Sequence, residues 1–349
     1  MTAQDIARQA GVSVATVYRV MGGHPSASPA AVQRVDRALA ELEALTPGDR
    51  YQRRRRPACR GGAGEVALML VGQPHSADLR LARGVETVLA AEGLRLLFTH
   101  TPSLARLPSV VRDRRVDGLL LCGWGYGGPD AESLRLLAGL PSVWIGTHQS
   151  DFGDCVQPDN RLIGRAAARW LLAHGARRLA VIGPEANHLE FVPRAAAFVG
   201  ECVAAGVWHW WYDDRRTGLD PFREVLPSLL DQLVATDPPV DGLFVAGDQY
   251  AAATHHLLAV RGRRPGRDVR LVTAGSDDKL VGLDPHPGLI DVGYDELGAV
   301  AARQLLWRLD HRREPERRVT LVPPRPCGDK RTQAADIRAA IRLAADLED

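Results

Sequence analysis

The stretch TAQDIARQAGVSVATVYRVMGG, residues 2–23, contains two short helical patterns separated by a sharp break. Gly11 ends the first pattern, in which small and apolar residues line one face. Ser13 is a natural N-cap for the second pattern, where Val17 and Val20 recur at i, i+3 and face inward. The stretch therefore predicts a helix, a tight glycine turn and a second helix.

A third helical pattern begins with Ser28 as its N-cap and Pro29 at the first helical position. Three short helices around such a turn match the helix-turn-helix design, in which the second helix enters the DNA major groove N-terminus first. The predicted DNA-binding residues on that helix and its cap are Ser13, Val14, Ala15, Thr16, Tyr18 and Arg19.

The side chains of the second helix differ in what they offer to DNA. Val14 and Ala15 offer only apolar contacts, for example to thymine methyl groups, and are expected to point away from the head's core. Arg19 suits either a guanine edge or a phosphate. The alternative is a head that contacts another protein, with its apolar residues serving only the core. The agreement of turn, cap and arginine placement favours DNA.

Residues 4–23, QDIARQAGVSVATVYRVMGG, resemble the N-terminal signature of the lactose-repressor family of bacterial transcription regulators, residue after residue. The resemblance implies that Val14, Ala15 and Arg19 read base edges. Tyr18 stands where the family commonly has serine, so this sequence departs from the pattern there.

Residues 45–64, LTPGDRYQRRRRPACRGGAG, follow the head. The family's hinge helix, with a leucine that enters the minor groove, has no counterpart in this stretch, and proline and glycine at both ends oppose a long helix. The stretch predicts a flexible tether whose arginines hold phosphates or enter a narrow minor groove, or alternatively a solvated linker. The arginines assigned to DNA binding are Arg53, Arg54, Arg55 and Arg56.

Charge and cysteine content narrow the class of protein. The net charge is +2, but the chain up to Gly61 has ten arginines and five acidic residues, so it carries about +5 and the rest about −3. A basic end on a weakly acidic body is typical of a nucleic-acid-binding module. Five cysteines without metal-type spacing predict reduced thiols in a cytoplasmic protein, and no apolar stretch suits a membrane span.

From Glu65 onward, short runs of valine, leucine and isoleucine alternate with helical patterns, as in EVALMLVG (65–72) and DGLLLCGW (117–124). Such alternation predicts βαβ units, and its repetition predicts two parallel sheets. Two doubly wound lobes leave a ligand crevice at the carboxyl ends of their strands. The family resemblance extends over roughly residues 2–332 and implies a body like a periplasmic sugar-binding protein.

The resemblance implies several effector-binding residues, while at other effector-binding positions of the family this sequence has a different residue. Arg194 matches an arginine that bonds ligand hydroxyls, Asp277 an acidic ligand contact, and Tyr294 an aromatic residue that closes on the ligand. Gly146 replaces an aspartate, and a glycine replaces an asparagine just before Asp248. Four residues that follow strand ends in the first lobe are candidate replacements: Asp78, Trp124, Tyr126 and His148. The full set of effector-binding candidates is Asp78, Trp124, His148, Arg194, Asp248, Asp277 and Tyr294.

Several candidates have a structural alternative. Without the resemblance, Arg194 reads as a solvated surface residue near a helix start, and Asp277 reads as the cap of a turn. The aromatic stretch GVWHWWYDDRR, residues 206–216, suits a ligand wall, an exposed patch between subunits or, the interpretation we favour, a packed strand or loop. Residues 332–349 suggest a short amphipathic helix that either packs on the body or joins subunits.

We therefore expect an all-α helix-turn-helix head joined to an α/β periplasmic-binding-protein-like body of two doubly wound lobes. The predicted domains are a head (1–46), an arginine-rich linker (47–64), an effector-binding and dimerisation body (65–332) and a helical tail (333–349). No catalytic motif, cofactor motif or metal motif is present.

The predicted function is a ligand-responsive transcriptional repressor that does not act as an enzyme. Its expected partners are an operator in double-stranded DNA, a sugar or related polar effector, and further copies of itself in a homodimer or tetramer. The alternative is a small-molecule sensor or enzyme whose helical head binds a protein.

Overall fold

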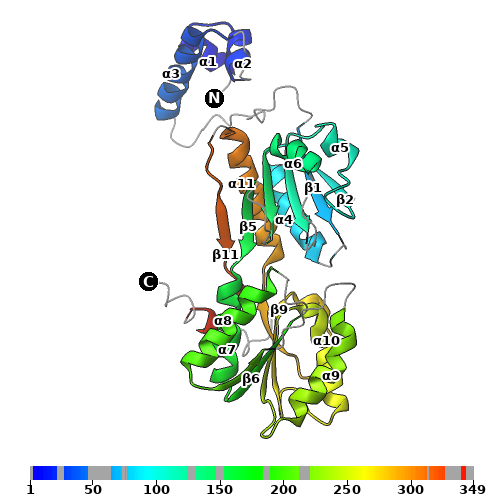
Figure 1. The fold of residues 1–349 in the computed structure, drawn as a ribbon. Coiled ribbons are helices and arrows are strands. Elements are labelled where there is room, and N and C mark those ends of the chain that lie inside the picture. Colours follow the sequence, from blue (N-terminus) through cyan, green and yellow to red (C-terminus); the bar gives the residue numbers. More distant parts are fainter. Residues whose placement is uncertain are drawn as a thin grey trace.

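The computed structural model describes residues 3–21, 27–45, 64–72, 75, 77–123, 131–146, 153–183, 189–211, 221–312, 314–326 and 339–342. Within them the chain forms a three-helix head and two α/β lobes (Figure 1). No helix in these ranges has both the length and the apolar character needed to span a bilayer. The described cysteines, Cys122, Cys155 and Cys202, are buried free thiols.

The head consists of α1 (Ala3–Ala10), α2 (Val14–Met21) and α3 (Pro29–Leu45). Gly11 has a φ of +62° with open space around it, so backbone conformation alone calls for glycine there. The predicted caps are confirmed, because the hydroxyls of Ser13 and Ser28 accept hydrogen bonds from the amides three residues on. The three helices bury a small core of Ile6, Ala7, Ala10, Val17, Val35 and Ala38.

The first lobe is a parallel sheet in the order β11-β5-β4-β3-β1-β2. Its strands are β1 (Glu65–Val71), β2 (Arg95–Thr101), β3 (Gly118–Gly123), β4 (Ser142–Ile145), β5 (Asp154–Pro158) and β11 (Val319–Val322). Its helices are α4 (Ala77–Ala91), α5 (Ser109–Arg112), α6 (Ala131–Ala138) and α11 (Tyr294–Asp310). Alternate residues of β1 and β3 belong to different apolar clusters, since helices cover both faces of the sheet.

The second lobe is a sheet in the order β12-β10-β9-β8-β6-β7, parallel except for β12. Its strands are β6 (Arg178–Ile182), β7 (Trp208–Trp211), β8 (Gly242–Val245), β9 (Arg270–Gly275), β10 (Gly288–Asp291) and β12 (Arg325–Pro326). Its helices are α7 (Asn160–Ala173), α8 (Phe191–Ala204), α9 (Pro221–Ala235) and α10 (Ala251–Val260), with 3-10 turns η1 (Asp248–Tyr250) and η2 (Asp277–Lys279).

The chain passes between the lobes three times: after β5, after β10, and between β11 and β12. Within each lobe the first strand lies between the second and the third, so the strand order reverses beside β1 in the first lobe and beside β6 in the second. Doubly wound sheets bind ligands outside the carboxyl ends of the strands at this reversal. The predicted fold class is confirmed.

Close helix crossings depend on glycine. A Cβ on Gly84 of α4 would overlap the carbonyl oxygen of Asp295, and one on Gly298 of α11 would overlap that of Leu81. A Cβ on Gly164 of α7 would likewise overlap the carbonyl of Arg194 on α8. These glycines allow the backbones of α4 and α11, and those of α7 and α8, to pack in direct contact.

Some local expectations needed correction. Helix α9 and the short strands β5, β10, β11 and β12 were not singled out from the sequence, and α5 is only a single helical turn. Within the aromatic stretch, Trp208–Trp211 form the edge strand β7, in which Trp208 and Trp211 are partly exposed. In the tail, Ala340 is buried in the main apolar cluster, so the described turn 339–342 packs on the body.

Candidate functional site

The predicted DNA-binding residues of α2 and its N-cap lie in two different environments. Ser13, Ala15 and Arg19 are exposed, and Thr16 is half-buried, with its hydroxyl 2.8 Å from the Ser13 Oγ. Val14 packs against the head's core, so the expectation that it points away from the core is wrong.

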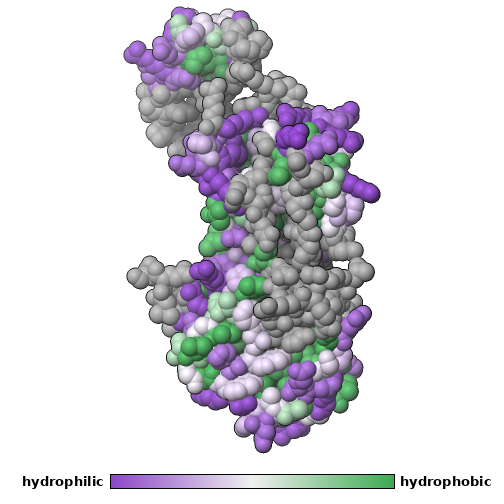
Figure 2. Space-filling model, in the orientation of Figure 1, coloured by the Kyte–Doolittle hydropathy of each residue, from purple (hydrophilic) through white to green (hydrophobic). Residues whose placement is uncertain are grey.

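Arg19 and Ala15 are four residues apart and therefore share one face of α2. The Arg19 guanidinium makes no ion pair or hydrogen bond with the residues that the structure describes, which leaves its five N–H donors for an external partner. In Figure 2 the coloured atoms at the outer edge of the head and at the neighbouring end of the first lobe are largely hydrophilic, and a small hydrophobic patch lies on the head. The side chain of Tyr18 and the whole of Arg53 to Arg56 lie outside the described residues.

Polar residues of both lobes meet where the carboxyl ends of the two sheets face each other. Arg194, in the first turn of α8, is the centre of this junction and is only 2% exposed. Its Nε donates to Asn160 Oδ1 at 2.7 Å, one Nη to the Ala246 carbonyl at 2.8 Å, and the other to Glu190 Oε2 at 3.2 Å. The reading of Arg194 as a solvated surface residue is therefore wrong.

Tyr294 belongs to the same cluster. It follows Gly293, whose φ of +70° turns the chain into α11, and it is almost completely buried. Burial raises the pKa of the Tyr294 phenol well above its usual value; the charges of Asp248 and Glu190 raise it further, while Arg194 lowers it. The predicted residues Arg194, Tyr294 and Asp248 are thus close enough to influence one another.

Asp248 connects two loops at the carboxyl ends of strands in the second lobe. Its Oδ2 accepts a hydrogen bond of 2.7 Å from the Ser276 amide, and its Oδ1 lies 3.7 Å from the Lys279 ammonium. A Cβ on Gly275 would overlap the Asp248 carboxylate, so this carboxylate fills the space beside the glycine. These contacts give Asp248 a structural role. That Asp248 also binds the effector remains a prediction.

Asp277 lies at the edge of the junction, with about half of its side chain exposed. Its carboxylate is 2.8 Å from His286 Nε2, and its carbonyl accepts the amide of Leu280 in the turn that follows β9. This geometry favours the structural alternative for Asp277, that of a residue holding a turn.

The first lobe contributes His75 and Asp78, which together cap the start of α4. The His75 Nδ1 accepts from the Ala77 amide at 3.2 Å, and the Asp78 carboxylate accepts from the His75 amide at 2.6 Å. Burial raises the pKa of Asp78, although the His75 amide and the charge of His100 oppose the change. Asp78 is therefore a buried carboxylate at the carboxyl end of β1.

Among the polar contacts that join the two lobes, His75 Nε2 lies 3.3 Å from the Nζ of Lys279. Burial lowers the pKa of His75, the positive charge of Lys279 lowers it further, and Asp248 opposes both effects. Cys122, at the end of β3, has its pKa raised by burial and then by the carboxylates of Asp78 and Glu190. Carboxylates of both lobes thus lie near this strand end.

Sequence reasoning missed Glu190, Asn160, His75 and Lys279. Two signals were available: Glu190 precedes Arg194 by the four residues of a helical ion pair, and Lys279 is one of only two lysines in a chain rich in arginine. Trp124 and His148, predicted from strand ends, lie outside the described residues. In the described part of the chain, no three His, Cys, Asp or Glu side chains gather as a metal site.

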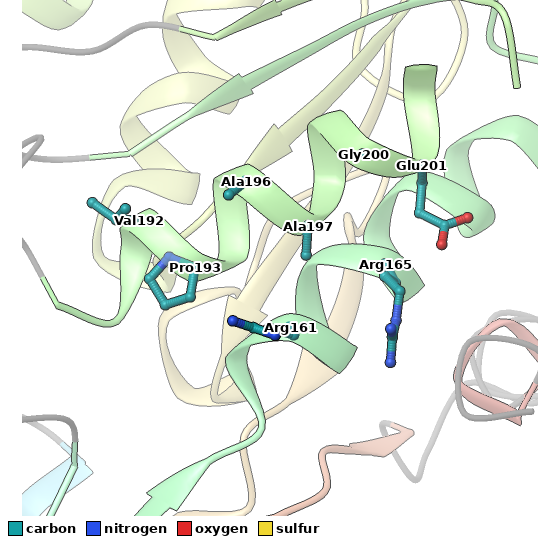
Figure 3. A pocket seen from close by; sticks show the side chains of 8 residues that line it. All are labelled: Arg161, Arg165, Val192, Pro193, Ala196, Ala197, Gly200 and Glu201. Atoms are coloured by element: carbon teal, nitrogen blue, oxygen red, sulfur yellow. The ribbon is translucent and has the colours of Figure 1, made fainter. Parts of the chain in front are cut away.

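A separate cavity of about 560 Å³ opens between α7 and α8. Figure 3 shows its lining: arginines of α7 face a stripe of α8 formed by Val192, Pro193, Ala196, Ala197, Gly200 and Glu201. Arg194 belongs to the buried stripe of α8 instead. The cavity and the lobe junction therefore use different faces of the same helix.

Comparison with known proteins matches both parts of the chain. A model of bacterial regulatory proteins of the lacI family matches residues 2–44, and a model of a periplasmic binding protein-like domain matches residues 168–328. The HTH-type transcriptional regulator in the aml 5′ region of Streptomyces limosus is 32% identical over 308 residues, covering 85% of this chain and 79% of that protein.

The HTH-type transcriptional regulator CelR of Thermobifida fusca is 29% identical over 325 residues, covering 88% of this chain and 92% of that protein. A solved structure of a transcriptional regulator CelR-cellobiose complex has the same fold, with a TM-score of 0.62 at 24% identity, over 93% of this chain and 97% of that one. Head and body are matched together, and the chain belongs to the lacI family of bacterial regulatory proteins, as a transcription regulator with a DNA-binding head.

Proposed function

We propose that the protein represses transcription by binding a pseudo-palindromic operator as a homodimer or a tetramer of dimers. The observation that carries the proposal is the exposed face of α2, on which Ala15 lies in the first turn after the capped N-terminus and Arg19 follows one turn later. The first turn of such a helix reads base edges in the major groove. Two copies related by a two-fold axis then read two half-sites.

The effector we propose is a sugar or a related polar metabolite bound at the lobe junction. Arg194 suits hydroxyl groups, since a charged donor makes a stronger hydrogen bond than a neutral one, and the ring of Tyr294 suits the apolar side of a sugar. The cellobiose in the CelR complex and the names of relatives such as the ribose operon repressor of Halalkalibacterium halodurans support a sugar. Trp124 and His148 remain candidate contacts.

Regulation follows from the position of that site. An effector that contacts both lobes favours one lobe arrangement over another, and the three crossing segments transmit the change to the rest of the chain. If the two arrangements hold the heads differently, effector affinity and operator affinity are linked. The arginines 53 to 56 of the linker add phosphate contacts close to the head.

Selection from random double-stranded DNA tests the operator proposal. We expect the purified protein to enrich a two-fold symmetric site, with binding that weakens as salt rises because phosphate contacts release counterions. Enrichment of no sequence, or of sites without two-fold symmetry, contradicts the proposed repressor function.

A further inference from the structure

Glu190 brings a carboxylate from the second lobe to a strand end of the first. The residue precedes α8, is 2% exposed, and bonds Arg194 through its Oε2. Its Oε1 lies 3.0 Å from the position that a Cβ on Gly146 would occupy. Gly146 follows β4 and has a φ of +94°. A side chain at residue 146 would crowd the Glu190 carboxylate. Glycine at this position therefore leaves space for the carboxylate.

Among the residues that the structure describes, the charges around the junction leave no surplus of positive charge. Arg194 is paired with Glu190, Lys279 faces Asp248 at 3.7 Å, and Arg80 lies 3.7 Å from Asp291. Asp78 remains in addition, buried and without an ion pair among the described residues. An anionic ligand bound here would find Arg194, Lys279 and Arg80 already neutralised by carboxylates. It would also lie near the carboxyl group of Asp78.

Arg194 still has donors to offer. Its bonds to Asn160, Ala246 and Glu190 use three of the five N–H groups of a guanidinium. A ligand hydroxyl can therefore accept from Arg194 and donate to Glu190 at the same time, which a carboxylate or phosphate oxygen without a hydrogen cannot do.

We propose that Glu190, placed opposite Gly146, is a specificity residue of the effector site that selects uncharged or amino sugars and excludes sugar acids and sugar phosphates. The inference rests on the proposed effector function. Glu190 accepts hydrogen bonds from ligand hydroxyl or ammonium groups and repels ligand anions at a buried position, where charge repulsion is poorly screened.

Matched sugar sets test the selection on the full-length protein. We would measure thermal shifts, then dissociation constants by titration calorimetry, with glucose, glucosamine, gluconate and glucose 6-phosphate, with cellobiose and cellobionate, and with ribose and ribose 5-phosphate. We expect stabilisation only by uncharged or amino compounds, and an acid or phosphate partner at least tenfold weaker than its neutral parent.

Glu190→Gln keeps the shape of the side chain and removes its charge. We expect this variant to bind the stabilising sugar at least tenfold more weakly and to lose most of its discrimination against the matched anion. Glu201→Gln is the control, because Glu201 lies on the same helix in an ion pair with Arg169, away from Gly146. If Glu190→Gln folds poorly, Gly146→Asn serves as the second variant. Its side chain crowds the Glu190 carboxylate without removing the charge, and we expect the variant to bind fewer of the sugars.

The outcomes separate the two proposals. Stabilisation of the wild type by a sugar acid or sugar phosphate, or equal affinities in Glu190→Gln and Glu201→Gln, overturns the role of Glu190 and leaves a sugar effector in place. Stabilisation by none of the compounds contradicts the sugar effector itself and the inference with it.

Discussion

Arg19 is the charged side chain of α2 that the head leaves exposed, and this makes it the sharpest residue-scale test of DNA recognition. We expect Arg19→Ala to weaken operator binding by about 1–3 kcal/mol if the guanidinium reads a guanine, and to relax preference at one position of the half-site. If it holds a phosphate instead, binding weakens evenly across sequences and the salt dependence falls by about one unit of slope.

The matched control for Arg19 is Arg37→Ala in the same head. Arg37 is also exposed, but it lies on α3 and is engaged with Glu41 at 3.0 Å. Electrophoretic or fluorescence titrations with the selected operator at several salt concentrations measure both variants. Equal effects of the two substitutions would show that α2 contributes only general positive charge.

His75 is placed between two hydrogen-bond donors. A neutral imidazole has a single acceptor nitrogen, yet the Ala77 amide faces Nδ1 and the Lys279 ammonium faces Nε2. The ring can accept from one of them, and the protonated ring can accept from neither. This geometry agrees with the lowered pKa of His75, in which burial and the Lys279 charge both oppose protonation.

The lowered pKa predicts a loss of stability in mild acid. The unfolded chain binds a proton at His75 near the usual value of 6.5, while the folded chain takes it up only at lower pH. The contribution of His75 to the free energy of unfolding is therefore fully present above pH 6.5 and is lost as the pH falls toward the lowered pKa. We expect the melting temperature to drop more between pH 7.5 and 5.5 in the wild type than in His75→Asn. Identical pH profiles would contradict this placement of His75.

At the scale of elements, the crossing of α4 and α11 depends on Gly84. Replacing glycine by alanine inside a helix gains up to about 1 kcal/mol of helix propensity. At Gly84 this gain is outweighed, because the new Cβ overlaps the Asp295 carbonyl and forces the helices apart. We expect Gly84→Ala to destabilise the protein by about 2–4 kcal/mol, of the size found for overpacking and lost core contacts.

Gly200 offers the matched comparison for Gly84. It also lies inside a helix, α8, and apart from its chain neighbours and the backbone of its own helix no atom lies within 4 Å of the position that a Cβ would take there. Gly200→Ala should therefore keep the propensity gain and leave stability unchanged or raise it by up to about 1 kcal/mol. Thermal and urea unfolding of both variants decide the point, and a stabilised Gly84→Ala would contradict the tight crossing.

The elements that the sequence predicted are those whose burial shows in their composition. β1 and β3 are apolar along their length because both faces are covered, and α2 and α3 have clear caps. α9 contains Pro227, and β11 and β12 are short strands that complete sheets begun far earlier in the chain, so local patterns carried little signal for them. The resemblance located Arg194, but the pair of His75 and Lys279 joins residues 204 positions apart, which no local pattern reveals.

At the scale of the whole molecule, two exposed apolar side chains flank the contact between the lobes. Leu79, in the first turn of α4, is 77% exposed and follows His75 by four residues; Val281 is 80% exposed and follows Lys279 by two. Since His75 and Lys279 are 3.3 Å apart, the two apolar side chains belong to neighbouring segments of different lobes. A dimer interface at this position would touch both lobes and so respond to their relative movement.

Aspartate substitutions test whether this surface joins two copies. Fully burying a leucine or valine contributes about 1.5–3 kcal/mol, so Leu79→Asp or Val281→Asp should weaken self-association at least tenfold and weaken operator binding with it. Val203→Asp is the control, since Val203 is also exposed, at 61%, but lies on α8 away from the lobe contact. Sedimentation equilibrium measures association directly. A dimer that tolerates aspartate at both Leu79 and Val281 places the interface elsewhere, and lobe movement then has to reach the heads through the three crossing segments alone.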